Sequence, residues 1–249
     1  MAELNAIVEY ANELLKINQF KDYCPNGLQV EGRAQVKKII SGVTACQALI
    51  DAATQEQADV LLVHHGYFWR SEDASITGIK LRRIKALLDN SLSLLAYHLP
   101  LDAHVELGNN VSLAARLGFQ TEGVLTSELI GNYGSLAQPL DADGLASRIS
   151  TALGREPLVI PAGPEKIQRI GWCTGAAQNY IDQAIRLELD AYISGEISEQ
   201  TVHQAREAGI HYFAAGHHAT ERYGVQSLGE HLAQHFDVSH QFIDIDNPV

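Results

Sequence analysis

The chain has 249 residues, of which 46% are hydrophobic, so it can bury the core of one large domain or of two smaller ones. Its 18 basic and 30 acidic residues give a formal net charge of −12, and the lack of a basic run argues against duplex nucleic acid as a partner. The N-terminus carries no basic targeting region, no apolar run reaches the roughly 20 residues that span a bilayer, and the three cysteines are widely spaced. The sequence therefore predicts a cytoplasmic protein with reduced thiols and no membrane partner.

Alternating helices and strands are predicted along the first half of the chain. Apolar residues at helical spacing indicate an opening amphipathic helix that ends near Asn18. The elements predicted after it are a strand at 37–44, a helix at 45–57, a strand at 59–63, a helix at 79–88 and a strand at 92–97. His64 and His65 directly follow the second strand, and His98 follows the third. Ligands of doubly wound α/β sheets bind beyond the carboxyl ends of the strands, so these histidines lie where a site is expected.

The two halves of the chain resemble each other. Residues 38–66 align with 169–196, and residues 96–102 align with 215–221. The aligned pairs include Thr44 with Thr174, Asp51 with Asp182, Asp59 with Asp190, His98 with His217 and Asp102 with Glu221. Each half thus ends its later strand with a histidine four residues before a carboxylate. This repeat predicts two similar α/β domains, at residues 1–124 and 125–249.

Two adjacent histidine pairs, His64–His65 and His217–His218, point to metal binding. Imidazole nitrogen combined with carboxylate oxygen suits Fe, Mn, Zn, Ni or Co, whereas a Mg or Ca site uses oxygen alone. Neighbouring side chains of a regular strand point to opposite faces, so an adjacent pair cannot chelate one ion there. At a strand end the same pair can reach two neighbouring ions. The pattern therefore predicts two divalent ions whose identity the sequence leaves open.

The segments around the later histidines carry two local signals. Pro100 argues against a regular helix across residues 98–102, which we predict as a loop. Thr220 is expected to cap a helix that begins at Glu221, which leaves His217 in the preceding loop. Phosphate-loop, dinucleotide-binding and serine-hydrolase motifs are absent from the sequence.

Five motifs together resemble the family of GTP cyclohydrolase 1 type 2 homologues, also called Nif-three-like proteins. They are PNGLQVEG at 25–32, VHHGYFW at 63–69, YHLPLDAHxxLGNN at 97–110, SGEISEQ at 194–200 and GHHATE at 216–221. The resemblance covers nearly the whole chain and fits the short bacterial form. It implies an α/β fold of two similar domains with a dinuclear metal site at their interface, and a ring-shaped homohexamer. The ligands that it implies are His64, His65, Asp102, His217 and Glu221.

The expected chemistry follows from this ligand set. Two divalent ions carry four positive charges, of which the two carboxylates balance half, so the centre would attract an anionic substrate. We expect a metal-dependent hydrolase of a small anionic molecule, for which the resemblance suggests a nucleotide. His98 is the expected catalytic residue for proton transfer, with His104 and Glu196 as further neighbours of the ligands. The alternative is a non-enzymatic metal carrier or scaffold, which closed metal sites would favour.

Overall fold

The structure, a computed structural model, describes residues 1–249 and divides into two compact units. Unit 1 comprises Met1–Leu101 and Gly224–Asp246, and unit 2 comprises Asp102–Tyr223 and Asn247–Val249. The chain enters unit 2 within α4 (Leu99–Ala103) and leaves it within α9 (His217–Phe236). The units differ from the expected ranges 1–124 and 125–249 in two places. Residues 102–124 belong to unit 2, and the end of the chain returns to unit 1, where β13 (Ser239–Phe242) pairs with β4 (Lys38–Thr44).

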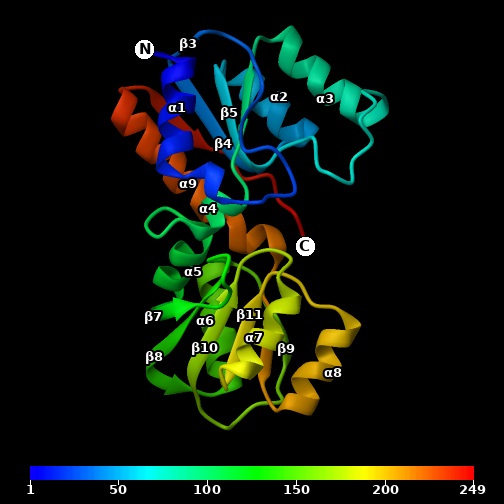
Figure 1. The fold of residues 1–249 in the computed structure, drawn as a ribbon, viewed down its shortest axis with the longest axis vertical. Helices are drawn as coiled ribbons and strands as arrows, with labels where there is room; N and C mark the ends of the chain where they lie inside the picture. The colour runs from blue at the N-terminus through cyan, green and yellow to red at the C-terminus, as the bar shows by residue number, and fades with distance from the viewer. The chain divides into compact units, whose positions relative to one another are not determined.

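Unit 1 is built on a five-stranded sheet with the order β13-β4-β5-β6-β2, in which all pairs are parallel except β6 with β2. Its strands are β2 (Gly27–Val30), β4 (Lys38–Thr44), β5 (Val60–His65), β6 (Ser93–Ala96) and β13 (Ser239–Phe242), with a separate pair β1 (Ala2–Glu3) and β3 (Gln35–Val36). Its helices are α1 (Leu4–Leu14), the short η1 (Ile17–Gln19), α2 (Gln47–Gln55) and α3 (Gly78–Asp89). The crossover helices α2 and α3 lie on one face of the sheet, and α1 and the later part of α9 lie on the other (Figure 1).

The core of unit 1 follows from the apolar pattern of its elements. Helix α2 buries Leu49, Ile50 and Ala53, which share one helical face. They pack in one cluster with Leu61 and Val63, which alternate along β5. Burying a side chain of this size contributes roughly 1.5–3 kcal/mol relative to exposing it, so this layer fixes β5 and the histidines at its end.

Unit 2 is built on a six-stranded sheet with the order β7-β8-β10-β11-β12-β9, whose β10-β11-β12 pairs are parallel and whose other pairs are antiparallel. The strands are β7 (Phe119–Val124), β8 (Asn132–Leu140), β9 (Leu158–Ile160), β10 (Ile167–Cys173), β11 (Ala191–Ser194) and β12 (His211–Ala214). The helices are α5 (Asn109–Leu117), α6 (Ala142–Leu153), the short η2 (Gln178–Tyr180), α7 (Ile181–Arg186) and α8 (Glu199–Ala208). Helices α5, α6 and the start of α9 share a core with the sheet, and α7 and α8 lie on its other face (Figure 1). The two units confirm the expected α/β class, and no helix combines the length and apolarity needed to cross a membrane.

Two local predictions were wrong. Residues 99–103 form the short helix α4 rather than a loop, because Pro100 sits in its first turn, where a backbone N–H is not needed for an intrahelical bond. Helix α9 begins at His217 rather than at Glu221. His217 and Glu221 therefore lie one turn apart on the same helix, which places their side chains on one face.

Candidate metal centre

Three histidines follow the carboxyl ends of neighbouring strands in unit 1. His64 and His65 are the last residues of β5, and His98 lies shortly after β6. Because β5 and β6 are parallel neighbours, their carboxyl ends meet at the same end of the sheet. The ring centroid of His64 lies 4.6 Å from that of His65 and 5.0 Å from that of His98. One ring nitrogen of each lies within 4.8 Å of the others, so the three imidazoles form one group.

Each of these imidazoles is held through Nδ1 by an oxygen of the same unit. Nδ1 lies 2.9 Å from the Tyr97 carbonyl for His64, 3.1 Å from Thr44 Oγ1 for His65 and 2.7 Å from Asp22 Oδ1 for His98. Metal-binding histidines commonly donate their second N–H to such an acceptor, which fixes the ring and its tautomer. When Nδ1 carries the hydrogen, Nε2 has the lone pair that a metal ion needs. The group therefore fits a set of nitrogen donors.

Two carboxylates and one imidazole gather in unit 2. Asp102 lies on α4, and His217 and Glu221 lie at the start of α9. His217 Nε2 is 3.0 Å from Glu221 Oε2, and carboxylate oxygens of Asp102 and Glu221 lie within 4.8 Å of each other. Asp102 is 6% exposed and Glu221 is 3% exposed. Carboxylates are rarely buried so deeply unless opposite charge or hydrogen bonds compensate them, so this group fits a divalent cation.

Neutral side chains orient Asp102. Asn109 Nδ2 donates to Asp102 Oδ1 over 2.8 Å, and Thr174 Oγ1 donates to the same oxygen over 3.3 Å. Asn110 accepts from the Thr174 backbone N–H and donates to the Asp102 carbonyl. All of these contacts lie in unit 2. These neutral partners fix the orientation of the carboxylate without bringing a positive charge to it.

A glycine makes room for Glu221. Gly175 follows β10 with φ +68°, a backbone conformation that favours glycine. A Cβ atom there would lie 2.1 Å from Glu221 Oε1 and 3.3 Å from His217 Nε2. The close approach of this loop to the carboxylate therefore requires glycine.

His217 is held between two carboxylates. Its Nε2 faces Glu221, and its Nδ1 lies 2.7 Å from Glu196 Oε1. Burial lowers the pKa of His217, but hydrogen bonds and charge from Glu221 and Glu196 outweigh it and raise the pKa to about 9. Without metal, His217 therefore carries a proton at neutral pH, and a bound ion would take the place of that proton.

The structure divides the predicted site residues between the units. His64, His65 and His98 group together in unit 1. In unit 2, Glu221 lies beside His217, and its carboxylate also lies near that of Asp102. Of the two further neighbours, Glu196 contacts His217. His104 instead accepts hydrogen bonds from the backbone N–H groups of the turn that follows it.

Sequence reasoning missed Asp22, Asn109 and Thr174. Asp22 precedes the first quoted motif in an irregular segment and has no periodic or spacing signal. Asn109 was part of a quoted motif, but only its place beside Asp102 reveals its role. Thr174 was noted only as a partner of Thr44 in the repeat.

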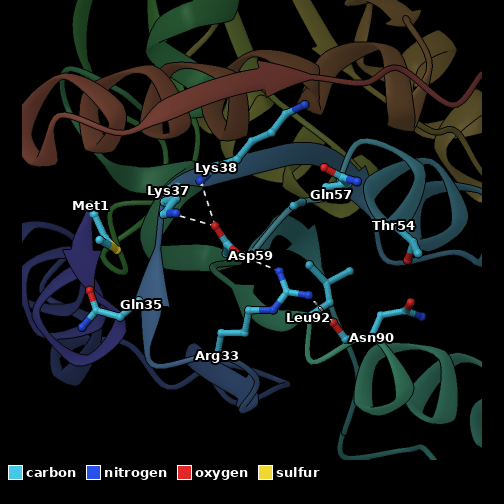
Figure 2. Close-up of a pocket in the computed structure, with 11 residues that line it drawn as sticks. Met1, Arg33, Gln35, Lys37, Lys38, Thr54, Gln57, Asp59, Asn90 and Leu92 are labelled. Carbon is cyan, nitrogen blue, oxygen red and sulfur yellow. Dashed lines mark hydrogen bonds and ion pairs between the residues drawn. The ribbon is translucent and has the colours of Figure 1, made fainter.

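A pocket of about 640 Å³ lies elsewhere in unit 1, beside the amino ends of β4 and β5. Figure 2 shows Asp59 in it, directed toward Arg33 and the backbone of Lys37 and Lys38. Burial raises the pKa of Asp59, but hydrogen bonds from Lys37 and Arg33 outweigh it and hold the pKa below its ordinary value. This carboxylate ties strand ends together and belongs to the scaffold.

Comparisons with known proteins agree with the quoted motifs. The family model for Duf34/NIF3 (NGG1p interacting factor 3) matches residues 2–248. A protein of Pseudomonas aeruginosa named GTP cyclohydrolase 1 type 2 homolog is 58% identical over 248 residues, which are 98% of this chain and 98% of that protein.

Solved structures agree as well. One described as protein ybgI, of unknown function, has a TM-score of 0.97 and 49% identity, and covers 100% of both chains. Another, from Thermus thermophilus, has a TM-score of 0.92 and 31% identity, and also covers 100% of both chains. The predicted resemblance is confirmed: this chain belongs to the Duf34/NIF3 family.

Proposed function

We propose that the protein is a metal-dependent hydrolase that acts on a small anionic molecule at a dinuclear centre. The proposed ligands are His64, His65, Asp102, His217 and Glu221. The observation that carries the proposal is the pair of buried carboxylates of Asp102 and Glu221 with the partly buried His217 beside Glu221, whose mixed oxygen and nitrogen donors suit a first-row divalent ion. The convergent imidazoles of unit 1 support it as a second source of donors.

Two ions, rather than one, agree with the donors. A catalytic zinc site uses three protein ligands and keeps one position open. The five proposed ligands, which come from two groups, are too many for one such site. Bound ions of Fe, Mn, Zn, Ni or Co would act as Lewis acids and lower the pKa of water toward neutrality. The metal identity stays open because the same donors bind each of these ions.

The charge of the proposed centre favours an anionic substrate. Asp102 and Glu221 supply two negative charges, which balance half of the charge of two divalent ions. A substrate with phosphate or carboxylate oxygens would complete the balance. The name GTP cyclohydrolase 1 type 2 homolog, carried by the relative from Pseudomonas aeruginosa, makes a nucleotide our first choice.

The remaining roles belong to side chains around the ligands. His98 is the proposed proton acceptor, because it shares a group with His64 and His65. Glu196 would hold the second ring nitrogen of His217. The resemblance of the motifs also leads us to propose a homohexameric ring.

The test compares Glu221→Gln with Glu207→Gln, a control on the exposed face of α8 in the same unit. Glutamine keeps the shape of Glu221 but removes its charge, so metal affinity should fall by at least about tenfold. We expect about two ions per wild-type chain by elemental analysis. After the variant is refilled to equal occupancy, it should still fail to turn over a nucleotide or phosphoester that the wild type and Glu207→Gln hydrolyse.

Two results would reject the proposal. Less than one ion per reconstituted wild-type chain would remove the dinuclear centre. Full loading without metal-dependent turnover of nucleotides, phosphoesters or cyclic amides, together with ready transfer of metal to an apo acceptor protein, would replace the hydrolase with a metal carrier.

A further inference from the structure

Asp22 is a buried carboxylate that accepts hydrogen bonds on both oxygens. Its side chain is 3% exposed and lies in the segment between η1 and β2. Oδ1 accepts from Tyr23 N over 2.6 Å and contacts His98 Nδ1 at 2.7 Å, and Oδ2 accepts from Asn26 Nδ2 over 2.8 Å and from Leu99 N over 2.9 Å. Four partners leave this carboxylate one orientation.

These contacts specify the tautomer of His98. Burial raises the pKa of Asp22, but the hydrogen bond and charge of His98 outweigh it, and the pKa falls below its ordinary value. An ionised carboxylate can only accept hydrogen bonds, so Nδ1 of His98 must carry the hydrogen. Nε2 then holds the lone pair of the neutral ring.

The surroundings also prevent the ring from turning. Asn26 donates to Asp22 and accepts from the His98 backbone N–H over 2.7 Å, so one amide clamps both residues. The Trp69 ring meets the His98 ring edge-on, with centroids 5.0 Å apart. A half-turn of the imidazole would set a C–H against the carboxylate and lose the charge-assisted hydrogen bond.

A metal ion between Asp22 and His98 is a weaker interpretation of the same contacts. Cys24 lies close enough to both for the three to share an ion. Burial raises the pKa of the Cys24 thiol to about 12, and the charge of Asp22 adds to this. A metal ion here would have to displace the proton of this thiol and the hydrogen bonds that already occupy both oxygens of Asp22.

We propose that Asp22 is a positioning residue that presents Nε2 of His98, as a proton acceptor, toward His64 and His65. The proposal rests on the proposed hydrolysis: Nε2 takes the proton of the attacking water, and the imidazolium later returns it to the leaving atom. Nδ1 keeps its own hydrogen throughout, so Asp22 stabilises the cation without becoming protonated. The step needs no co-reactant beyond water.

The first test measures the tautomer and needs no substrate. Solid-state NMR of the full chain labelled with 15N-histidine, with His98 assigned by its loss in His98→Gln, would be recorded about two pH units above the ordinary histidine pKa. The sample would be measured both metal-free and loaded with diamagnetic Zn²⁺. We expect the Nδ1–H form of His98 in at least about tenfold excess in both states, since a charged acceptor favours it. Wild type in the Nε2–H form would overturn the proposal, whether or not the chain proves to be a hydrolase.

The second test compares Asp22→Asn with Asp51→Asn, an exposed aspartate on α2 of the same unit. Asp22→Asn should reduce the tautomer excess by at least about tenfold, because the amide can also donate to Nδ1, and Asp51→Asn should not change it. With a substrate in hand and metal content equal, kcat should fall in Asp22→Asn with little change in KM. An unchanged tautomer excess in folded Asp22→Asn would show that Asp22 does not position the ring. If Asp22→Asn does not fold, the tautomer of His98 in the wild type still decides whether the proposal stands.

Discussion

Units 1 and 2 share a scaffold and differ in what they attach to it. In unit 1 the parallel strands β4, β5 and β6 are followed in the sheet by an antiparallel edge strand, β2. In unit 2 the parallel strands β10, β11 and β12 are followed in the same way by β9. Their crossover helices lie on one face in each unit (Figure 1). This repeated frame was predicted from the aligned segments of the two halves.

Each unit has an aspartate that accepts hydrogen bonds from two successive backbone N–H groups. Asp59 accepts from the backbone N–H groups of Lys37 and Lys38, at 2.8 and 3.1 Å. Asp190 accepts from those of Gln168 and Arg169, both at 2.8 Å. The two were aligned by sequence, so this contact supports an internal repeat down to single hydrogen bonds.

The two units differ in the candidate metal-binding side chains that they carry. Unit 1 carries the imidazoles of His64, His65 and His98, whereas unit 2 carries the carboxylates of Asp102 and Glu221, with one histidine beside them. The strands of each unit therefore fix the position of such a side chain, and the identity of the residue after the strand determines its chemistry.

The largest expected effect tests the shared scaffold. Asp59→Ala and Asp190→Ala each leave two backbone N–H groups without their acceptor, and we expect each to lower the free energy of unfolding by about 2–4 kcal/mol. Asp51→Ala and Asp182→Ala, an aligned pair on the exposed faces of α2 and α7, should change it by less than about 0.5 kcal/mol. Urea unfolding measures both. A large loss for only one of Asp59 and Asp190 would break the comparison between the units.

The next effect sharpens the difference between the donor groups. His217 has a pKa raised from 6.5 to about 9 in the metal-free chain, so its interaction with Glu221 stabilises the fold fully below about pH 6.5 and is lost as the pH rises through about 9. The side chain is 25% exposed, and allowing for solvent screening we expect a contribution of about 2 kcal/mol.

The measurement is urea unfolding of metal-free wild type and His217→Gln near pH 6 and pH 10. The stability advantage of the wild type should shrink by about 2 kcal/mol between these values. Metal affinity of the wild type should rise over the same range, because binding displaces the proton from His217. An advantage that does not change with pH would show that unit 2 does not hold a charged imidazole.

Local patterns predicted strands β4, β5 and β6, helices α1, α2 and α3, and the histidines at the strand ends, because each depends on periodicity within a short segment. The pairing of β13 with β4 could not be predicted, since the two lie at opposite ends of the chain and neither carries a signal for the other. Asp22 was missed for the same reason: its partners His98 and Leu99 are distant in sequence.

The structure does not follow the sequence alignment of residues 96–102 with residues 215–221. Ser93 N bonds to Asp59 O as His211 N bonds to Asp190 O, so Ser93 corresponds to His211. Counting onward from this pair places His98 opposite Gly216 rather than His217. The sequence alignment matched His98 with His217 by residue type, whereas the structural register depends on hydrogen bonds between strands that the sequence does not display.

The smallest expected effect concerns Gly175, which lies shortly after β10 in unit 2 and differs from its counterpart in unit 1. Asp59 N bonds to Lys38 O as Asp190 N bonds to Arg169 O, so Lys38 corresponds to Arg169, and counting onward places Thr44 of unit 1 opposite Gly175 of unit 2. Unit 1 has room for a side chain at this position, where Thr44 Oγ1 contacts His65, whereas a Cβ atom at Gly175 would meet Glu221. Gly175→Ala gives this position of unit 2 a Cβ atom, as unit 1 has, and it should displace the carboxylate.

Gly154→Ala is the matched control, because Gly154 has φ +69° against +68° for Gly175 but no atom within 4 Å of its added Cβ. Both variants carry the cost of a left-handed alanine, roughly 1–2 kcal/mol. Gly175→Ala should lose about 1 kcal/mol more in unfolding free energy, and its metal affinity should fall by about tenfold, the equivalent of ~1.4 kcal/mol. Metal titration by calorimetry separates the two, since Gly154→Ala should bind metal as the wild type does. If Gly175→Ala also binds as the wild type does, Glu221 is not a ligand in the place where the structure puts it, and unit 2 requires glycine for the backbone conformation alone.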